Sequence, residues 1–291
     1  MTPSPRADLL LAVAAAEAGD IPLASALARQ LGYALAPIGT DPASCENFAV
    51  LLMVSGGELA LQQTLALASG ATAGTGKRRS ARPAAARALP GPVTVDFGSD
   101  AMRHRRRSGH NELLGRAVGI GGGRRPHVLD ATAGLGRDSF VLADTGCTVT
   151  LCEREPVIAA MLAQGLQLAQ SQGDEWLRSV VQRMSLFPGD ARDPGAMRPG
   201  QPDVIYLDPM FPGRDKSAAV KKEMALFHAL LQSGDCQHDA EELLLWALAR
   251  DVARVVVKRP PRAPYLAGRK PSHSIAGKAV RFDVHVLRAL A

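Results

Sequence analysis

Three short apolar runs, each ending in a carboxylate, constrain this chain more than any other feature of its sequence. They close at Asp130, Glu153 and Asp208. A run that is apolar throughout is typical of a parallel strand buried on both faces. Helical patterns lie between the runs, so we expect right-handed crossovers and a mostly parallel sheet flanked by helices. The three carboxylates should then lie along the carboxyl edge of this α/β sheet, where ligands of such folds bind.

The first 92 residues predict a small N-terminal α+β subdomain. A helical pattern covers Ile21–Leu31, and two strand-like runs, Phe48–Val54 and Glu58–Leu65, flank a Gly-Gly pair typical of a hairpin turn. Residues 69–92 are rich in Ala, Gly, Pro and Arg, a composition that cannot build a core. We therefore predict a basic insertion or linker at 69–92 and a main domain at 93–291.

Alternating patterns place further elements in the main domain. They are a strand at Val93–Phe97, helices at Glu112–Val118, Pro156–Gln170, Ala218–Leu231 and Asp239–Arg250, a strand at Val252–Val257, and a last strand at Arg281–Leu287 that we expect at an antiparallel edge. This alternation of strands and helices favours a single α/β sheet with helices on its faces.

Composition and charge narrow the class of protein. The net charge of +6 favours an anionic partner such as nucleic acid. The four cysteines include no C-x-x-C pair and no His at zinc spacing, so we expect reduced thiols in the cytoplasm and no metal. The apolar stretch Leu9–Ala16 is too short to span a bilayer, and we predict no membrane segment.

A glycine-rich turn follows the first run and leads into a helix. Gly134 and Gly136 in this turn should bring backbone N–H groups close to a ligand. The dinucleotide fingerprint needs a third glycine where Ser139 stands, which disfavours a pyrophosphate and with it a nucleotide-dependent oxidoreductase. Glu153, at the end of the next run, is placed to accept hydrogen bonds from ribose hydroxyls.

Asp190 follows another apolar stretch and could accept the exocyclic amine of an adenine, although its Pro-Gly-Asp turn also occurs without ligands. A glycine turn, a ribose acid and an adenine acid in this order resemble the pattern of class I methyltransferases that use S-adenosyl-L-methionine (SAM). The sequence therefore favours a SAM site over a dinucleotide site.

The third run continues as Asp208-Pro209-Met210-Phe211, which resembles the Asn/Asp-Pro-Pro-aromatic motif of amino-directed methyltransferases. In that motif the acid or amide and the first proline carbonyl accept hydrogen bonds from an NH₂ group, and the aromatic ring stacks on its base. Met210 departs from the motif. The motif alone leaves adenine N6, cytosine N4 and a protein glutamine open as acceptors.

The sequence around these motifs resembles the ribosomal RNA small subunit methyltransferase J family. The matching segments are Val95–Phe97, Ala101–Arg106, Asp130–Asp138, Asp208–Pro212, Lys216–Ala218, Val220–Met224, Val255–Pro260 and Lys278–Asp283. The resemblance runs from about Val93 to the C-terminus. It implies a Rossmann-like class I fold and transfer of a methyl group from SAM to the N2 amine of a guanine in 16S ribosomal RNA, in naked RNA or in the 30S subunit.

Site residues follow from the motifs together with the resemblance. The expected cofactor contacts are Asp130, Gly134, Gly136, Arg137, Asp138, Glu153, Arg154, Asp190, Ala191 and Asp208. Asp208 and the Pro209 carbonyl should accept the amine hydrogens while Phe211 stacks on a flipped guanine, with no metal required.

Cationic segments are the expected contacts with RNA phosphates. They contain Arg103, His104, Arg105, Arg106, Lys216, Lys221, Lys222, Lys258 and Arg259. Lys258 and Arg259 could instead simply end a buried strand. A non-catalytic RNA-binding or ribosome-assembly protein on the same fold is the alternative from a different class, and the sequence does not determine the oligomeric state.

Overall fold

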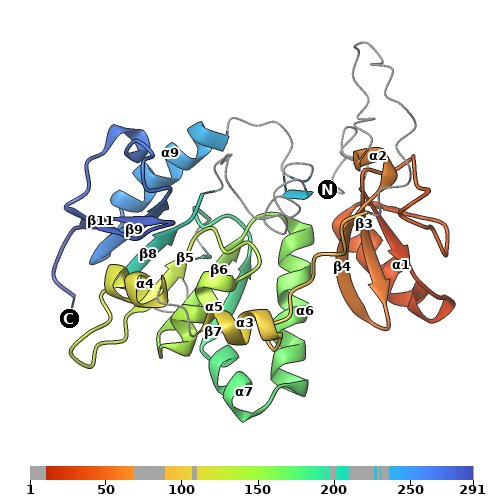
Figure 1. Ribbon diagram of the computed structural model, residues 1–291, viewed down its shortest axis with the longest axis horizontal. Coiled ribbons are helices and arrows are strands. Elements are labelled where there is room, and N and C mark those ends of the chain that lie inside the picture. The colour runs from red at the N-terminus through yellow and green to blue at the C-terminus, as the bar shows by residue number, and fades with distance from the viewer. Residues whose placement is uncertain are drawn as a thin grey trace. The chain divides into compact units, whose positions relative to one another are not determined.

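The structure, a computed structural model, describes residues 11–68, 89–106, 110–193, 195–196, 201–209, 226–227, 230 and 236–290. The chain divides into two compact units with a boundary between Thr94 and Val95, and Figure 1 shows the elements of each. No helix in these described ranges is long and apolar enough to cross a membrane.

The first unit contains a four-stranded sheet in the order β2-β1-β3-β4. Its elements are β1 (Leu11–Ala15), η1 (Ala18–Asp20), α1 (Ile21–Leu31), β2 (Ala34–Leu35), β3 (Val50–Ser55), β4 (Glu58–Gln63) and α2 (Leu65–Ala68). The predicted helix ends at Gly32, whose φ of 73° is left-handed. The predicted hairpin is also confirmed, because β3 and β4 pair antiparallel around Gly56 and Gly57, both with positive φ.

The second unit contains a seven-stranded sheet in the order β10-β11-β9-β8-β5-β6-β7. Its strands are β5 (His127–Asp130), β6 (Thr148–Glu153), β7 (Met184–Pro188), β8 (Val204–Leu207), β9 (Arg254–Arg259), β10 (His273–Ala276) and β11 (Arg281–Val286). Strands β5 to β9 pair parallel, whereas β11 pairs antiparallel with both β9 and β10. The mostly parallel α/β sheet predicted from the sequence is therefore confirmed.

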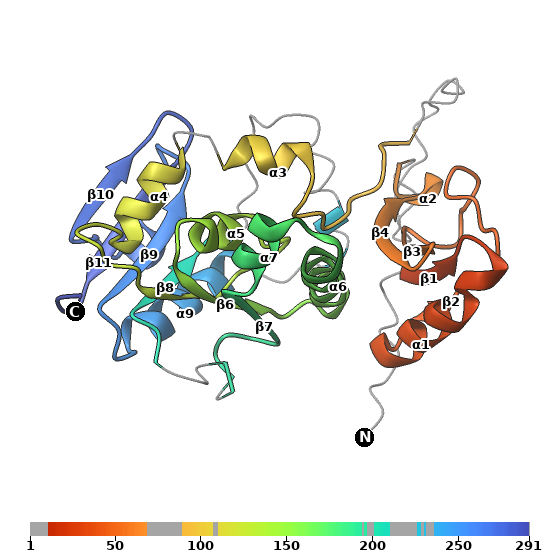
Figure 2. The same cartoon turned by 90° about the horizontal axis from the view of Figure 1, so that it is seen from below.

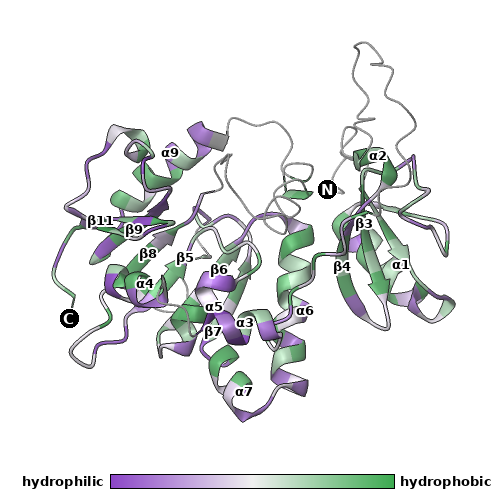
Figure 3. Cartoon of the chain, viewed as in Figure 1, coloured by the Kyte–Doolittle hydropathy of each residue, from purple (hydrophilic) through white to green (hydrophobic). Residues whose placement is uncertain are grey.

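Helices cover both faces of this sheet. They are α3 (Asp100–Arg105), α4 (His110–Val118), α5 (Arg137–Asp144), α6 (Pro156–Gln172), α7 (Glu175–Val181), α9 (Cys236–Leu248) and the 3-10 helix η2 (Leu266–Gly268). Figure 2 shows α4 and α5 on one face and α9 on the other. Leu243 and Leu244 of α9 are buried against Leu129, Ile205 and Val255 of the sheet. In Figure 3, α6 is mostly hydrophobic, whereas α3 with its cationic run is hydrophilic.

Two predicted elements differ from the structure, and one lies outside it. Val93–Phe97 is not a strand, because only Val93 finds a backbone partner, an isolated bridge to Leu61. The final strand β11 is not at the edge, since the short and mostly exposed β10, which gave no clear strand pattern in the sequence, lies beyond it. The predicted helix at 218–231 falls almost wholly outside the described residues.

Candidate active site

The carboxylates that end the three apolar runs leave the sheet at the same edge. Asp130 is the last residue of β5 and pairs in register with Leu151 of β6 and Tyr206 of β8. Glu153 ends β6, and Asp208 directly follows β8. Because these strands are parallel neighbours, the sheet itself brings together acids that are far apart in the sequence.

The glycine turn between β5 and α5 depends on two left-handed residues. Gly134 has φ +53° and Gly136 has φ +71°, a region that favours glycine. A Cβ at Gly136 would come within 2.8 Å of Leu162 and 3.1 Å of Phe97, so this glycine also allows close packing. A Cβ at Gly134 would meet nothing within 4 Å, which leaves the backbone there open to a ligand.

Asp130 connects this turn to α5. One carboxylate oxygen accepts the Thr132 N–H at 3.1 Å, and the other accepts the Ser139 hydroxyl at 2.5 Å. Ser139, which stands at the position of the third fingerprint glycine, is therefore used to bind Asp130. Burial raises the pKa of Asp130 to about 7, although these two hydrogen bonds oppose the shift.

Glu153 is held against the glycine turn. Its Oε2 accepts the Gly134 N–H at 2.8 Å, and its Oε1 accepts the Glu155 N–H at 2.7 Å. Burial raises the pKa of the Glu153 carboxyl, and the two backbone donors oppose that shift. The carboxylate therefore has one fixed orientation beside Gly134. A carboxylate that binds two adjacent hydroxyls needs such a fixed orientation.

Lys258 of β9 joins two further acids on the face of the sheet that carries α5. Its Nζ donates to Asp138 Oδ2 at 2.7 Å and to Asp208 Oδ2 at 2.8 Å. Asp138 also accepts the Tyr206 hydroxyl at 2.7 Å and pairs with Arg105. The Asp208 backbone N–H donates to the Thr132 hydroxyl at 2.7 Å. Asp208 is thus held from both its backbone and its side chain.

The charges in this cluster balance one another. Burial alone would lower the pKa of Lys258, but Asp208 and Asp138 raise it above its usual range. Burial alone would raise the pKa of Asp138, but Lys258 and Arg105 lower it below its usual range. Lys258 is therefore charged at neutral pH, because the two neighbouring carboxylates stabilise its ammonium form. The side chain of Asp208 is 39% exposed, so a substrate can reach it.

The RNA contacts predicted for Lys258 and Arg259 need correction. The Lys258 ammonium lies between two carboxylates instead of facing outward. Arg259 is only 5% exposed, and its Nη2 donates to the Pro264 carbonyl. Successive side chains of β9 point to opposite faces, so both residues belong to the interior of the unit. Neither is placed as a surface contact for phosphates.

The cationic run on α3 lies against acids of its own unit. Arg103 pairs with Asp174 at 2.8 Å, Arg106 pairs with Asp144 at 3.0 Å, and Arg105 pairs with Asp138. The guanidinium groups of Arg103 and Arg106 also lie over the Trp176 ring, with 5.1 and 4.2 Å to its centroid. His104 is exposed. These arginines are partly exposed, but each already has an intramolecular counter-charge.

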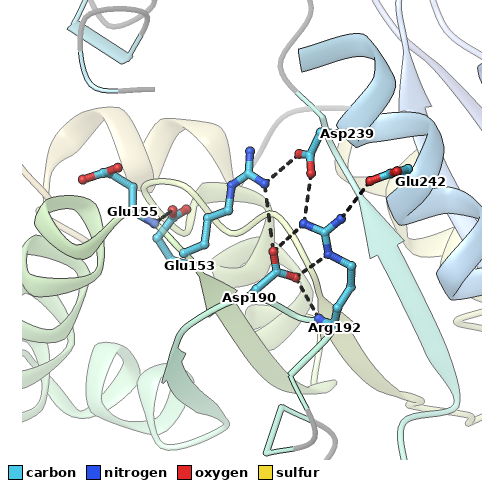
Figure 4. Close-up of polar contacts among 7 residues, drawn as sticks. Glu153, Glu155, Asp190, Arg192, Asp239 and Glu242 are labelled. Carbon is cyan, nitrogen blue, oxygen red and sulfur yellow. Dashed lines mark hydrogen bonds and ion pairs between the residues drawn. The ribbon is translucent and has the colours of Figure 1, made fainter. Parts of the chain in front are cut away.

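A second ionic network surrounds Asp190 after β7 (Figure 4). Arg192 donates to both Asp190 oxygens, at 2.8 and 2.6 Å, and to Asp239 of α9 at 2.9 Å. Arg154 pairs with Asp239 at 2.7 Å. Arg192 lowers the pKa of Asp190 mainly through its side-chain hydrogen bond. The sequence indicated Asp190 and Arg154 but missed Asp239 and Arg192, which carried no motif.

The remaining predicted residues divide into two groups. Ala191 is buried at 2% exposure beside Asp190, Arg137 is the first residue of α5, and Pro209 is buried next to Asp208. Those outside the described residues are Met210, Phe211, Pro212, Lys216, Lys221 and Lys222.

The chemistry of this edge fits SAM. Five acids gather on or beside it: Asp130, Asp138, Glu153, Asp190 and Asp208. Lys258, Arg105 and Arg192 balance part of this negative charge, and carboxylate oxygens accept hydrogen bonds from hydroxyl and ammonium groups such as those of SAM. The open backbone at Gly134 and the oriented Glu153 carboxylate supply contacts for a nucleoside.

Comparisons with known proteins agree with this geometry. The model of a family described as SAM-dependent methyltransferases matches residues 79–287. A relative from Thioalkalivibrio sulfidiphilus named ribosomal RNA small subunit methyltransferase J is 58% identical over 201 residues, covering 68% of this chain and 77% of its own. A relative of the same name from Pseudomonas paraeruginosa is 52% identical over 204 residues, covering 69% and 76%.

A solved structure is similar over almost the whole chain. It is a SAM-dependent methyltransferase from Neisseria gonorrhoeae, with a TM-score of 0.65 and 29% sequence identity. The match covers 96% of this chain and 97% of that one. The similarity in structure therefore extends over both compact units.

Proposed function

Because the chain belongs to the ribosomal RNA small subunit methyltransferase J family and is a SAM-dependent methyltransferase, we propose that its acid-lined sheet edge is the methyl-transfer site. The acceptor we propose is the exocyclic N2 amine of one guanine in 16S ribosomal RNA, presented as RNA or as the 30S subunit in the cytoplasm. The observation that carries this proposal is the position of Asp208, an oriented and reachable acid directly after β8.

Asp208 and Pro209 act on the acceptor amine. A guanine N2 lone pair is delocalised into the ring and is a weak nucleophile. The Asp208 carboxylate and the Pro209 carbonyl accept its two hydrogens, which increases lone-pair density on nitrogen and stabilises the positive charge that develops there. Bound SAM supplies an electrophilic methyl group. Most of the acceleration then comes from holding the amine in line with that methyl.

Lys258 and Asp138 prepare Asp208 for this task. The Lys258 ammonium donates a hydrogen bond to the Asp208 carboxylate and restricts its side chain to one orientation. Asp138 keeps the ammonium in place from the other side, and Tyr206 and Arg105 hold Asp138. Lys258 is thus a positioning residue in this proposal.

The cofactor contacts follow the sheet edge. Gly134, Gly136 and Arg137, with Asp130 and Asp138 beside them, would hold the methionine part of SAM. Glu153 would accept the ribose hydroxyls, with Arg154 next to it. Asp190 and Ala191 would contact the adenine, and the ionic network with Asp239 holds their loop to α9.

Phe211 would stack on the guanine, which has to leave its stack to reach Asp208. Lys216, Lys221 and Lys222 follow this segment in the sequence and, together with Arg103, His104, Arg105 and Arg106, are the cations proposed for phosphate contacts. The paired arginines of α3 would first have to exchange their acids for phosphates.

Methylation with labelled SAM of unmodified 16S RNA and of 30S particles, followed by mapping of the modified base, tests the function. We expect one N2-methylguanine. Label on an adenine or cytosine, or no label with either substrate while SAM binds, contradicts the proposal. Asp251→Asn is a suitable control for Asp208→Asn, because Asp251 is an exposed carboxylate before the amino end of β9, whereas Asp208 follows the carboxyl end of the parallel neighbour β8. The control variant should keep full activity.

A further inference from the structure

A pocket of about 540 Å³ lies apart from the acid cluster, between α4, the turn that follows it, β9 and β10. Three arginines line it: Arg116 from α4, Arg124 from the turn, and Arg254 from the start of β9. His273 and Ser274 of β10 add polar side chains to the lining. Among the described residues that line it there is no Asp or Glu, so this lining is cationic.

Among the described residues, these arginines have no acid partners, in contrast to the arginines in and directly after α3. Arg103, Arg105 and Arg106 each pair with an aspartate. Across the part of the chain that the structure describes, neither Arg116, Arg124 nor Arg254 forms an ion pair. Cations gathered without counter-charge repel one another, and a bound anion would remove that cost.

Arg254 forms the inner part of the pocket. Its Nη1 donates to the Ala117 carbonyl at 3.2 Å, while its Nε is buried and has no hydrogen-bond acceptor among the described residues. The guanidinium packs over Gly119, where a Cβ would lie 3.0 Å from Arg254 Cζ. Burial, and then the charge of Arg124, lower the pKa of Arg254. A half-buried cation with donors to spare is suited to an anionic ligand.

The pocket shares a strand and a face with the proposed active site. Arg254 and Lys258 are four residues apart on β9, and both point to the face that carries α4 and α5. Their Cα atoms are about 13 Å apart along the strand, roughly four steps of a stacked nucleic acid strand. An RNA molecule with one base at Asp208 is therefore long enough to place another of its phosphates in the pocket.

We propose that Arg116, Arg124 and Arg254 bind a backbone phosphate of the substrate RNA, outside the nucleotide that is methylated. The inference rests on the proposed function in taking RNA as the substrate. A guanidinium donates two parallel hydrogen bonds to a phosphate, which suits these residues better than a carbonyl or a neutral ligand. The pocket anchors the RNA strand while the acid cluster holds the target amine.

The double variant Arg116→Gln/Arg124→Gln tests the proposal, because both side chains are exposed and their loss leaves the core intact. Affinity for an unmodified 16S RNA fragment is measured by fluorescence anisotropy over a range of salt concentrations. We expect binding about tenfold weaker at 0.1 M salt and a log–log salt slope shallower by about 0.7 to 0.9, the value for one lost phosphate contact. SAM affinity, measured by calorimetry, should not change. Arg178→Gln, an exposed arginine of α7, is the matched control and should bind RNA normally.

Unchanged RNA affinity and salt slope in the double variant would overturn the proposal. The proposal would also be overturned if the pocket bound a free anion instead of RNA. In that case 10 mM inorganic phosphate would stabilise the parent protein but not the variant, and both would bind RNA with equal affinity. RNA binding is measured without methyl transfer, so the two hypotheses fail separately. Parent protein that binds RNA but never methylates it contradicts the proposed function alone.

Discussion

The two ends of strand β9 carry cations on the same face but in opposite electrostatic settings. At its carboxyl end, Lys258 lies between Asp138 and Asp208, 2.7 and 2.8 Å away. At its amino end, Arg254 lies near Arg124 and, among the described residues, near no acid that pairs with it. A cation whose charge is balanced inside the protein serves to orient its partners, whereas one whose charge is not balanced is suited to a ligand from outside.

A count of positive residues would treat Lys258 and Arg254 alike, although their surroundings suit them to different roles. In our proposals the Lys258 end holds Asp208 in position for the acceptor amine, and the Arg254 end donates hydrogen bonds to a phosphate. The following variants test whether pairing is what distinguishes the two ends.

Lys258→Met should have the largest effect. It leaves Asp138 and Asp208 without their shared cation, and breaking such a partly buried pair costs about 3 to 5 kcal/mol. Urea unfolding should show this loss. The double variant Lys258→Met/Asp138→Asn should recover part of it, because one of the stranded charges is then absent. A double variant destabilised by the full sum of the two single effects would contradict the coupling.

Asp130→Asn extends the comparison to an acid that has hydrogen bonds but, among the described residues, no paired cation. Asp130 ionises near pH 7 in the folded protein and near 3.8 in the unfolded chain. Between these values the unfolded state holds fewer protons, so stability falls as pH rises. Relative to the variant, the parent protein should lose about 3 kcal/mol between pH 5 and pH 8. The free energies of unfolding of the parent protein and the variant, measured without cofactor at pH 5 and pH 8, check this prediction. If both proteins showed the same change in stability between these pH values, the prediction would be wrong.

Asp208→Asn should lower kcat about 100-fold, equivalent to about 2.7 kcal/mol, because one charged acceptor of the amine hydrogens is lost. SAM affinity and RNA affinity should change little. Single-turnover methylation of 16S RNA measures the effect. Full activity with unchanged cofactor affinity would show that Asp208 has no catalytic role.

Arg103→Gln should have the smallest effect. Arg103 and Asp174 form an exposed pair, with side chains 43% and 49% exposed, and such solvent-screened pairs contribute little to stability. Because Arg103 already has a counter-charge, its loss should also weaken RNA binding less than the loss of Arg116. Parallel unfolding and anisotropy measurements on both variants decide this. A larger RNA effect at Arg103 would mean that α3, not the pocket, is the main phosphate contact.

Much of the fold could be predicted because its signals are local. The runs ending at Asp130 and Glu153 became parallel strands, and the helix predicted at Ile21–Leu31 has those limits in the structure. Strand β10 could not be predicted, because its four residues are mostly exposed and depend on β11 for their pairing.

The candidate site shows the same division. An apolar run that ends in an acid, or a glycine turn that enters a helix, is a property of adjacent residues, so the sequence by itself determined where the acids leave the sheet. Lys258 lies 50 residues from Asp208 and 120 from Asp138 along the chain. Electrostatic energy depends on distance in space, not in sequence. Only the tertiary structure therefore decided that Lys258 is paired while Arg254, on the same strand and face, is left for a ligand.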